Sequence, residues 1–369
     1  MEIIIKQREL LNALSIVEKA ISSKTIIESL KGIKIIARDN SLTFIASKTE
    51  LAIEYKLDNV NVVEEGTIVV FGNQFINIVK KLTDHETEIK IHTENNLVIL
   101  QTETSKVSLI TLNVYDYPEI NFDSNDEKYI VPKSLLQQAY NKTKYSIATN
   151  TAKVLLTSIN LSFTEESLRA ASTDSKRLSF VTLDPVPGLD LDMNISKFLY
   201  QDIIKVLDLV DVKNVELYKS SKQIQIECPN LKLKGRLIDG EYPLVENLIP
   251  SRSNYSFEIS APALLSALDK VQSLSDKSNS VVTIEHIDGR LLIKFFIQEL
   301  GGIEEFVQIT NIEGNPFKIA FDPSYVIDAL HSISKDQVKI SFEAETSAFQ
   351  INSVEGEDNI QVISPIRMS

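Results

Sequence analysis

Apolar residues follow two different periods along this chain. Near its start they are spaced four, three and four positions apart, as on one face of a helix, at Leu10, Leu14, Val17 and Ile21. A similar stripe lies near its end, at Val326, Leu330 and Ile333. The residues between them form short apolar or alternating runs separated by turn residues, and Asp288-Gly289 between two such runs predicts a β-hairpin. The pattern indicates an α+β protein with many short strands.

This pattern occurs three times. An apolar run, a polar break and Leu-Leu, with Ala two or three residues later, recur at Leu10-Leu11, Leu135-Leu136 and Leu264-Leu265, at intervals of 125 and 129 residues. A second segment recurs at 76–82, 201–207 and 327–333, and an acidic-Tyr-Pro triplet at Asp116 and Glu241. Such a period fits whole domains and is too long for a solenoid unit. We therefore predict three similar domains, each with two helices, at residues 1–124, 125–251 and 252–369.

Composition places these domains in an ordinary globular protein. Of the 369 residues 43% are apolar and 24% are charged, and no apolar run approaches the ~18 residues of a membrane span. The N-terminus has neither a basic region nor a small-residue cleavage site. The single cysteine, Cys228, excludes an internal disulfide and suits a reducing compartment. We expect a cytoplasmic protein without a membrane partner.

The charge distribution leaves two interpretations open. A net charge of −13 argues against binding nucleic acid over the whole surface, but it permits a local basic lining. Lys80, Lys81 and Lys205 occupy corresponding places in the second repeated segment, and Lys197 precedes it in the central third. These are either ordinary surface lysines or parts of one shared basic surface.

Signals for catalysis are weak. The four histidines are scattered without metal-ligand spacing, and His331 takes a position held by lysine in the other thirds. Phosphate-binding loops and dinucleotide fingerprints are missing. Asp190-Leu191-Asp192 has the spacing of a two-metal site, but it follows Pro185, Pro187 and Gly188, so we expect it on a loop. The sequence predicts no catalytic residue, metal site or cofactor.

Four further motifs point to a family. They are Leu156-Thr157-Ser158-Ile159-Asn160, Thr173-Asp174-Ser175-Lys176-Arg177-Leu178, Asp239-Gly240-Glu241-Tyr242-Pro243 and Val362-Ile363-Ser364-Pro365-Ile366-Arg367. In this order on a triplicated chain they resemble the bacterial sliding clamps, the β subunits of DNA polymerase III, and most closely those of low-GC Gram-positive type. The resemblance extends from the first helix to the last residues.

The resemblance implies the DNA-clamp fold, in which three domains each pack two helices on antiparallel sheets. It also implies a head-to-tail homodimer, a ring of six domains that encircles double-stranded DNA without sequence specificity. Such a protein is a processivity factor without an active site. It tethers the replicative polymerase α-type subunit, the clamp loader and other proteins that carry clamp-binding motifs. The alternatives are a nucleotidyltransferase or nuclease in its own right, and a triplicated scaffold that never touches DNA.

The resemblance also implies three groups of site residues. The expected partner-peptide cleft contains Leu156, Thr173, Ser175, Lys176, Arg177, Leu178, Pro243, Asn247, Leu248, Thr346, Ala348, Val362, Ile363, Ser364, Pro365, Ile366, Arg367 and Met368. The DNA-facing candidates are Lys24, Lys80, Lys81, Lys153, Lys197 and Lys205. The dimer-interface candidates are Val107 and Leu274.

Three cleft positions depart from the family pattern. Lys176 stands where His is usual, Asn247 where a basic residue is common, and Ser364 where a large apolar residue normally closes the pocket. We expect a shallower or more open subsite, and Ser364→Met should then tighten peptide binding.

Overall fold

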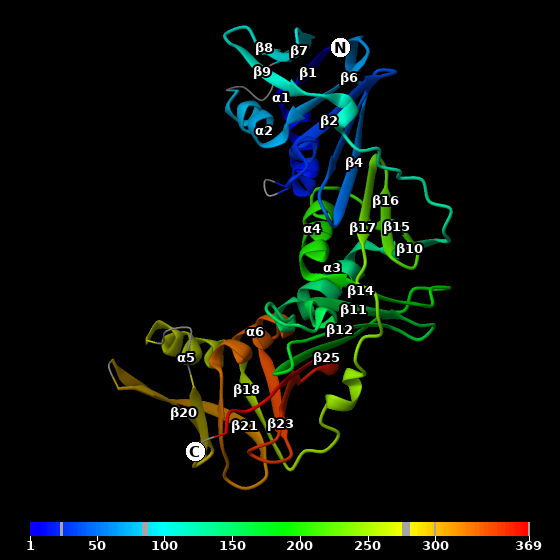
Figure 1. The fold of residues 1–369 in the computed structure, drawn as a ribbon. Coiled ribbons are helices and arrows are strands. Elements are labelled where there is room, and N and C mark those ends of the chain that lie inside the picture. Colours follow the sequence, from blue (N-terminus) through cyan, green and yellow to red (C-terminus); the bar gives the residue numbers. More distant parts are fainter. Residues whose placement is uncertain (23–24, 83–87, 275–280, 299, 368–369) are drawn as a thin grey trace. The chain divides into compact units, whose positions relative to one another are not determined.

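The computed structural model describes residues 1–22, 25–82, 88–274, 281–298 and 300–367. In this part of the chain six α-helices accompany two large antiparallel sheets, which confirms the predicted α+β class. The chain separates into two compact units, each containing one sheet (Figure 1). The first unit contains Met1–Ser134 and Phe198–Leu237, and the second contains Leu135–Lys197 and Ile238–Ser369.

Two helices belong to each third of the chain. They are α1 (Gln7–Val17), α2 (Gly72–Lys81), α3 (Lys133–Thr143), α4 (Lys197–Leu207), α5 (Ala261–Leu274) and α6 (Pro323–Ile333). The predicted apolar stripes are confirmed, because their members inside α1 and α6 are buried. Asp322 caps α6 by accepting a hydrogen bond from the Ser324 backbone N–H at 2.9 Å, and Pro323 takes the first helical position. No helix in the described residues has the length and apolar character needed to span a membrane.

Thirteen strands of the described residues form the sheet of the first unit. In order across the sheet they are β10 (Lys128–Pro132), β15 (Asn214–Lys219), β16 (Gln223–Cys228), β17 (Leu231–Arg236), β4 (Leu51–Asp58), β3 (Ser41–Ser47), β2 (Gly32–Arg38), β6 (Gly66–Phe71), β9 (Lys106–Leu112), β8 (Leu97–Gln101), β7 (Glu88–Glu94), β1 (Glu2–Lys6) and β5 (Asn61–Glu64).

Twelve described strands form the sheet of the second unit. In order they are β14 (Leu191–Ser196), β11 (Ser158–Phe163), β12 (Leu168–Thr173), β13 (Arg177–Leu183), β25 (Gly356–Ile363), β24 (Phe349–Ser353), β23 (Gln337–Phe342), β18 (Tyr255–Ser260), β21 (Gly301–Glu313), β20 (Arg290–Ile297), β19 (Val282–Ile287) and β22 (Lys318–Phe321). The predicted hairpin is confirmed: Asp288 and Gly289 join β19 to β20 with φ angles of 46° and 73°.

The three thirds share one order of elements: a strand, a helix, four strands, a second helix and three strands, with β5 as an addition in the first third. By this order β4, β13 and β21 are equivalent strands, and so are β9, β17 and β25. In each sheet a strand of the first set, β4 or β13, pairs with a strand of the second set, β17 or β25, that comes from the next third of the chain. We call the β4–β17 pair the first junction and the β13–β25 pair the second junction.

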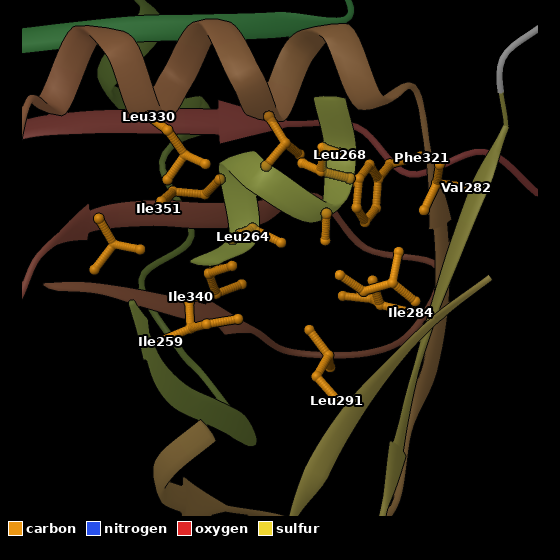
Figure 2. Close-up of a cluster of buried hydrophobic side chains, with 14 of the residues drawn as sticks. Ile259, Leu264, Leu268, Val282, Ile284, Leu291, Phe321, Leu330, Ile340 and Ile351 are labelled. Atoms are coloured by element: carbon orange, nitrogen blue, oxygen red, sulfur yellow. The ribbon is translucent and has the colours of Figure 1, made fainter. Parts of the chain in front are cut away.

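The two faces of each sheet differ. Helices cover one face; in the second unit α5 and α6 bury the core of the last third, where side chains from both helices and from the strands turn toward one another (Figure 2). On the opposite face, which we call the outer face, each junction has a smaller apolar cluster.

The expected position of Asp190-Leu191-Asp192 was wrong in part. The turn that contains Gly188 ends early enough for β14 to begin at Leu191, which pairs with Phe163. Asp192 is therefore on a strand, where its Oδ1 accepts a hydrogen bond from Asn160 Nδ2 at 2.9 Å.

Candidate functional site

The turn between β12 and β13 contains the most distinctive sequence motif and is fixed by its own side chains. Thr173 Oγ1 accepts from the Ser175 N–H at 3.1 Å and donates to the Arg177 carbonyl at 2.7 Å. Asp174 Oδ1 accepts from the backbone N–H groups of Lys176 and Arg177. These bonds allow Ser175 to adopt a left-handed conformation, with φ of 74°, and leave Lys176 exposed at the tip.

Arg177 is directed toward the helices. Its Nε donates to Asp174 at 3.1 Å and its Nη1 donates to Asp328 on α6 at 2.6 Å, while the guanidinium lies 4.4 Å from the centre of the Tyr325 ring. The side chain is 14% exposed. Since successive strand residues face opposite sides, Leu178 points to the outer face. Arg177 therefore ties the turn to α6 and is not among the residues that line the outer face.

The outer face of the second junction has an apolar floor. Its buried members come from β12, β13, β25 and the segment after β17: Ala171, Leu178, Phe180, Val245 and Val362. Ala348, Tyr242, Ile249 and Ile360 pack against them and are partly buried. Leu178 and Val362 are direct cross-strand neighbours. Of the predicted cleft residues, the structure brings Leu178, Val362 and Ala348 together here.

Tyr242 links this floor to the turn. Its hydroxyl oxygen accepts a hydrogen bond from the Thr173 N–H at 3.1 Å, and burial raises the pKa of the phenol to about 12. Beyond Tyr242 a short 3-10 helix, η6 (Val245–Leu248), leaves the predicted residues Asn247 and Leu248 exposed; Leu248 is 57% exposed.

The segment after β25 passes close to the same turn. The Ser364 N–H donates to the Lys176 carbonyl at 2.9 Å, and the Ile366 N–H donates to the Ala320 carbonyl on β22 at 2.7 Å. Ser364, Ile366 and Arg367 are exposed, and Pro365 is half-buried.

Other predicted cleft residues lie apart from this floor. Ile363 is 1% exposed and belongs to the core of the last third, since it alternates with Val362 along β25. Leu156 is buried within a short 3-10 helix, η5 (Val154–Thr157). Among the described residues it does not belong to the apolar floor of the second junction. Pro243 and Thr346 are exposed, and Met368 lies outside the described residues.

The predicted DNA-facing lysines are mostly exposed. Lys80 and Lys81 end α2, Lys205 lies in the last turn of α4, and Lys153 precedes η5; all four are exposed. Lys80 lies 3.3 Å from Glu18, Lys197 is the half-buried first residue of α4, and Lys24 lies outside the described residues. His331 is exposed on α6, as predicted.

The predicted dimer residues are both partly buried. Val107 lies on β9, and Leu274 ends α5 and packs against the core of the last third.

Sequence reasoning missed several members of the outer face. Phe180 is two residues beyond Leu178 on the same strand, so strand periodicity could have identified it. Val245, and Gln350, which lies opposite Val362 on β24, had no such local signal, because their places depend on pairing between distant segments. In the described residues no group of three or more His, Cys, Asp or Glu side chains could hold a metal ion.

Three family models together match most of the chain. They describe the N-terminal, central and C-terminal domains of the DNA polymerase III beta subunit, and they match residues 1–121, 130–244 and 246–367. A beta sliding clamp of Halalkalibacterium halodurans is 28% identical over 366 residues, covering 95% of each chain. A beta sliding clamp of Bacillus subtilis is 27% identical and covers 100% of both chains.

Solved structures show the same architecture. The crystal structure of the DNA polymerase sliding clamp from Bacillus subtilis superposes with a TM-score of 0.93 at 26% identity, covering 100% of each chain. A DNA polymerase III beta chain from Streptococcus pneumoniae gives the same TM-score, identity and coverage.

Proposed function

The chain belongs to the DNA polymerase III beta subunit family, and from that premise we propose that two copies close head to tail into a ring around duplex DNA. Its function is that of a sliding clamp, a processivity factor whose polymerase is a separate subunit. We expect the dimer to act in the cytoplasm.

Two free strand edges carry the proposal of a ring. Residues Lys106–Ile110 of β9 pair only with β8, and residues Gly301–Val307 of β21 pair only with β20, within the described residues. By position β9 is equivalent to β17 and β25, and β21 is equivalent to β4 and β13. The two edges are therefore the halves of a third junction, which two copies of the chain can form twice.

The hairpin registers predict how this third junction pairs. On the β8–β9 hairpin Val107 lies opposite Leu100, and on the equivalent β16–β17 hairpin Leu233 lies opposite Ile226, so Val107 and Leu233 hold equivalent positions. On the β20–β21 hairpin Ile303 lies opposite Phe295, and on the equivalent β3–β4 hairpin Ile53 lies opposite Ala46, so Ile303 and Ile53 hold equivalent positions. Since Ile53 pairs with Leu233 at the first junction, Ile303 should pair with Val107 of a second copy. This register puts Lys106 opposite Glu304, as Lys232 is opposite Glu54.

Exposed apolar residues support the same register. Ile110 is 68% exposed and Leu300, immediately before β21, is 65% exposed. The proposed pairing sets them opposite one another. Phe296, which is 75% exposed, lines a hollow of about 460 Å³ beside the same edge. Covering these side chains would remove apolar surface from water in both copies.

Topology explains how such a ring holds DNA. A closed ring cannot leave long duplex, so its contacts with DNA can be few and weak. Exposed lysines on the helices, including Lys81 and Lys205, supply phosphate contacts without sequence information, while the net charge of −13 discourages binding elsewhere.

The outer face of the second junction is the proposed docking site for partner peptides. Leu178, Val362 and Phe180 form an apolar floor together with Val245, and Leu248, three residues after Val245 in η6, is exposed. An apolar anchor in a groove with polar groups at the rim is the usual design of a peptide site. The proposed partners are the replicative polymerase, the clamp loader and other proteins with clamp-binding motifs.

Retention on circular DNA tests the ring. Chains loaded by a clamp loader onto nicked circular DNA should stay bound and should be lost when the circle is linearised. A size measurement in solution should show a dimer. Equal retention on circular and linear DNA, or a monomer at all concentrations, would contradict the proposal.

A further inference from the structure

The outer face of the first junction already holds an extended segment of the chain itself. Ala52, Lys234 and Gln225 form a row across β4, β17 and β16, each opposite the next. The linker after β9 crosses this row. Lys234 Nζ donates to the Asn121 carbonyl at 2.8 Å, and Gln225 Nε2 donates to the Phe122 carbonyl.

An aromatic anchor fixes this linker. The Phe122 side chain is 4% exposed and lies in the outer cluster of the first junction, whose buried members are Ile45, Ala52, Val69, Tyr117 and Phe122. The linker is thus held by one buried phenyl ring and by side-chain donors to two consecutive backbone carbonyls. A buried carbonyl needs such a donor, because burial without a hydrogen bond is costly.

The second junction has a row of the same construction. Leu178, Val362 and Gln350 lie opposite one another on β13, β25 and β24, in the places of Ala52, Lys234 and Gln225. Gln350 is buried, and its Nε2 reaches Asn352 Oδ1 at 3.3 Å. Gln225 Nε2 likewise reaches an acceptor two residues further along its strand, on Glu227.

The two linkers differ where the anchor should be. Phe122 is the fifth residue after Tyr117, and the fifth residue after Tyr242 is Asn247. Because η6 coils this part of the second linker, Asn247 and Leu248 are exposed. The outer face at Leu178 therefore has an apolar floor and a glutamine, and its own linker supplies Val245 but no side chain in the place of Phe122.

We propose that the second junction holds a partner peptide as the first junction holds its linker, with Gln350 Nε2 donating to a backbone carbonyl of the peptide. The inference rests on the proposed function, which makes this groove the docking site. The ligand class is an extended peptide. The residue whose carbonyl accepts from Gln350 should carry a large apolar side chain, as Phe122 does in the linker. The first junction is the same kind of groove, closed in cis by Phe122.

A peptide copied from the first linker provides the probe. A labelled peptide of residues 116–124, acetylated at its N-terminus and amidated at its C-terminus, should bind the full-length wild type at one site per chain. Gln350→Leu should weaken binding about tenfold, which corresponds to the net loss of one hydrogen bond. Gln350→Asn, which keeps the amide but shortens its reach, should weaken it similarly. Gln225→Leu is the matched control and should leave the affinity unchanged.

A swap of the anchor tests the inference independently. Asn247→Phe should let the second linker fill its own groove and lower peptide affinity about tenfold or more. Phe122→Ala should open the first groove and raise the stoichiometry to two peptides per chain, whereas Phe198→Ala, at an exposed ring on α4, should not.

The outcomes separate the two proposals. If the wild type does not bind the peptide, or if Gln350→Leu and Gln350→Asn bind it as the wild type does, the inference is overturned. Retention on circular DNA tests the ring without reference to this peptide, so it can succeed while the inference fails.

Discussion

The two internal junctions have the same strand pairing but opposite distributions of polarity. On the helix-facing side the first junction pairs Ile53 with Leu233, and both are buried. The second pairs Ser179 with Gln361, whose Oε1 accepts from the serine hydroxyl at 2.7 Å. Gln361 Nε2 also donates to Ser332 Oγ on α6 at 3.0 Å, within a buried network of hydrogen bonds.

On the outer face the first junction has the polar pair member, because Ala52 lies opposite Lys234, whereas the second pairs Leu178 with Val362. At the first junction the linker buries Phe122 in the apolar cluster, and at the second the linker buries Val245 while Asn247 and Leu248 stay exposed. A strand pair can therefore be stabilised from either face of the sheet. The second junction is held by hydrogen bonds and by Arg177 on its helix-facing side.

The largest effect should come from removing the cover. Phe122→Ala should lower the free energy of unfolding by about 3–5 kcal/mol, because it empties a buried phenyl site. Leu248→Ala, at the exposed end of the second linker, should change it by less than about 0.5 kcal/mol. Denaturant unfolding measures both. Equal losses of unfolding free energy in the two variants would contradict this prediction, because the two linkers would then contribute equally to stability.

The ionic contacts of the two junctions should differ next. Arg177→Met leaves Asp174 and Asp328 without their shared cation and should cost about 2–3 kcal/mol. Lys48, between β3 and β4, forms an ion pair with Asp202 on α4, so Lys48→Met leaves one aspartate without its cation and should cost about 1 kcal/mol. Unfolding midpoints at low and high salt compare them. A larger loss of unfolding free energy for Lys48→Met than for Arg177→Met would contradict the prediction that the second junction depends more on its ion pairs.

The proposed third junction extends the comparison to two chains. Lys106→Glu should oppose Glu304 and weaken each copy of the junction by about 1 kcal/mol, and Glu304→Lys should do the same. The double variant should recover the dimer. Sedimentation over a dilution series measures the change. A double variant as weak as either single variant would contradict the predicted register.

The smallest effect is a dependence on alkaline pH. Burial raises the pKa of Tyr242 to about 12, whereas an unfolded tyrosine titrates near 10. Above about pH 10 the unfolded state therefore loses this proton first, so stability falls as pH rises toward 12. Tyr242→Phe removes the hydrogen bond to Thr173 and should lower the free energy of unfolding by about 1 kcal/mol at neutral pH. The free energy of unfolding of this variant should fall less between about pH 10 and pH 12 than that of the wild type. An unchanged alkaline slope would argue against a buried phenol.

Local sequence pattern accounts for much of the fold. The helical stripes at Leu10 and Leu330 and the turn at Asp288 are short-range signals, and the structure confirms each. The direction of Arg177 and the position of Gln350 opposite Val362 depend on which distant strands pair and in which register. That choice is made by packing between thirds of the chain, so no local window contains it. The domain boundaries and the site residues remain predictions.

The edges of β9 and β21 that no described strand covers have a consequence for assembly. A contact between unlike surfaces closes only when the curvature of the chain brings the last edge back to the first; otherwise each added copy exposes a fresh edge and growth continues as a filament. In the proposed pairing the two edges are complementary, so the size of the assembly depends on whether the second contact between two copies forms before a third copy adds.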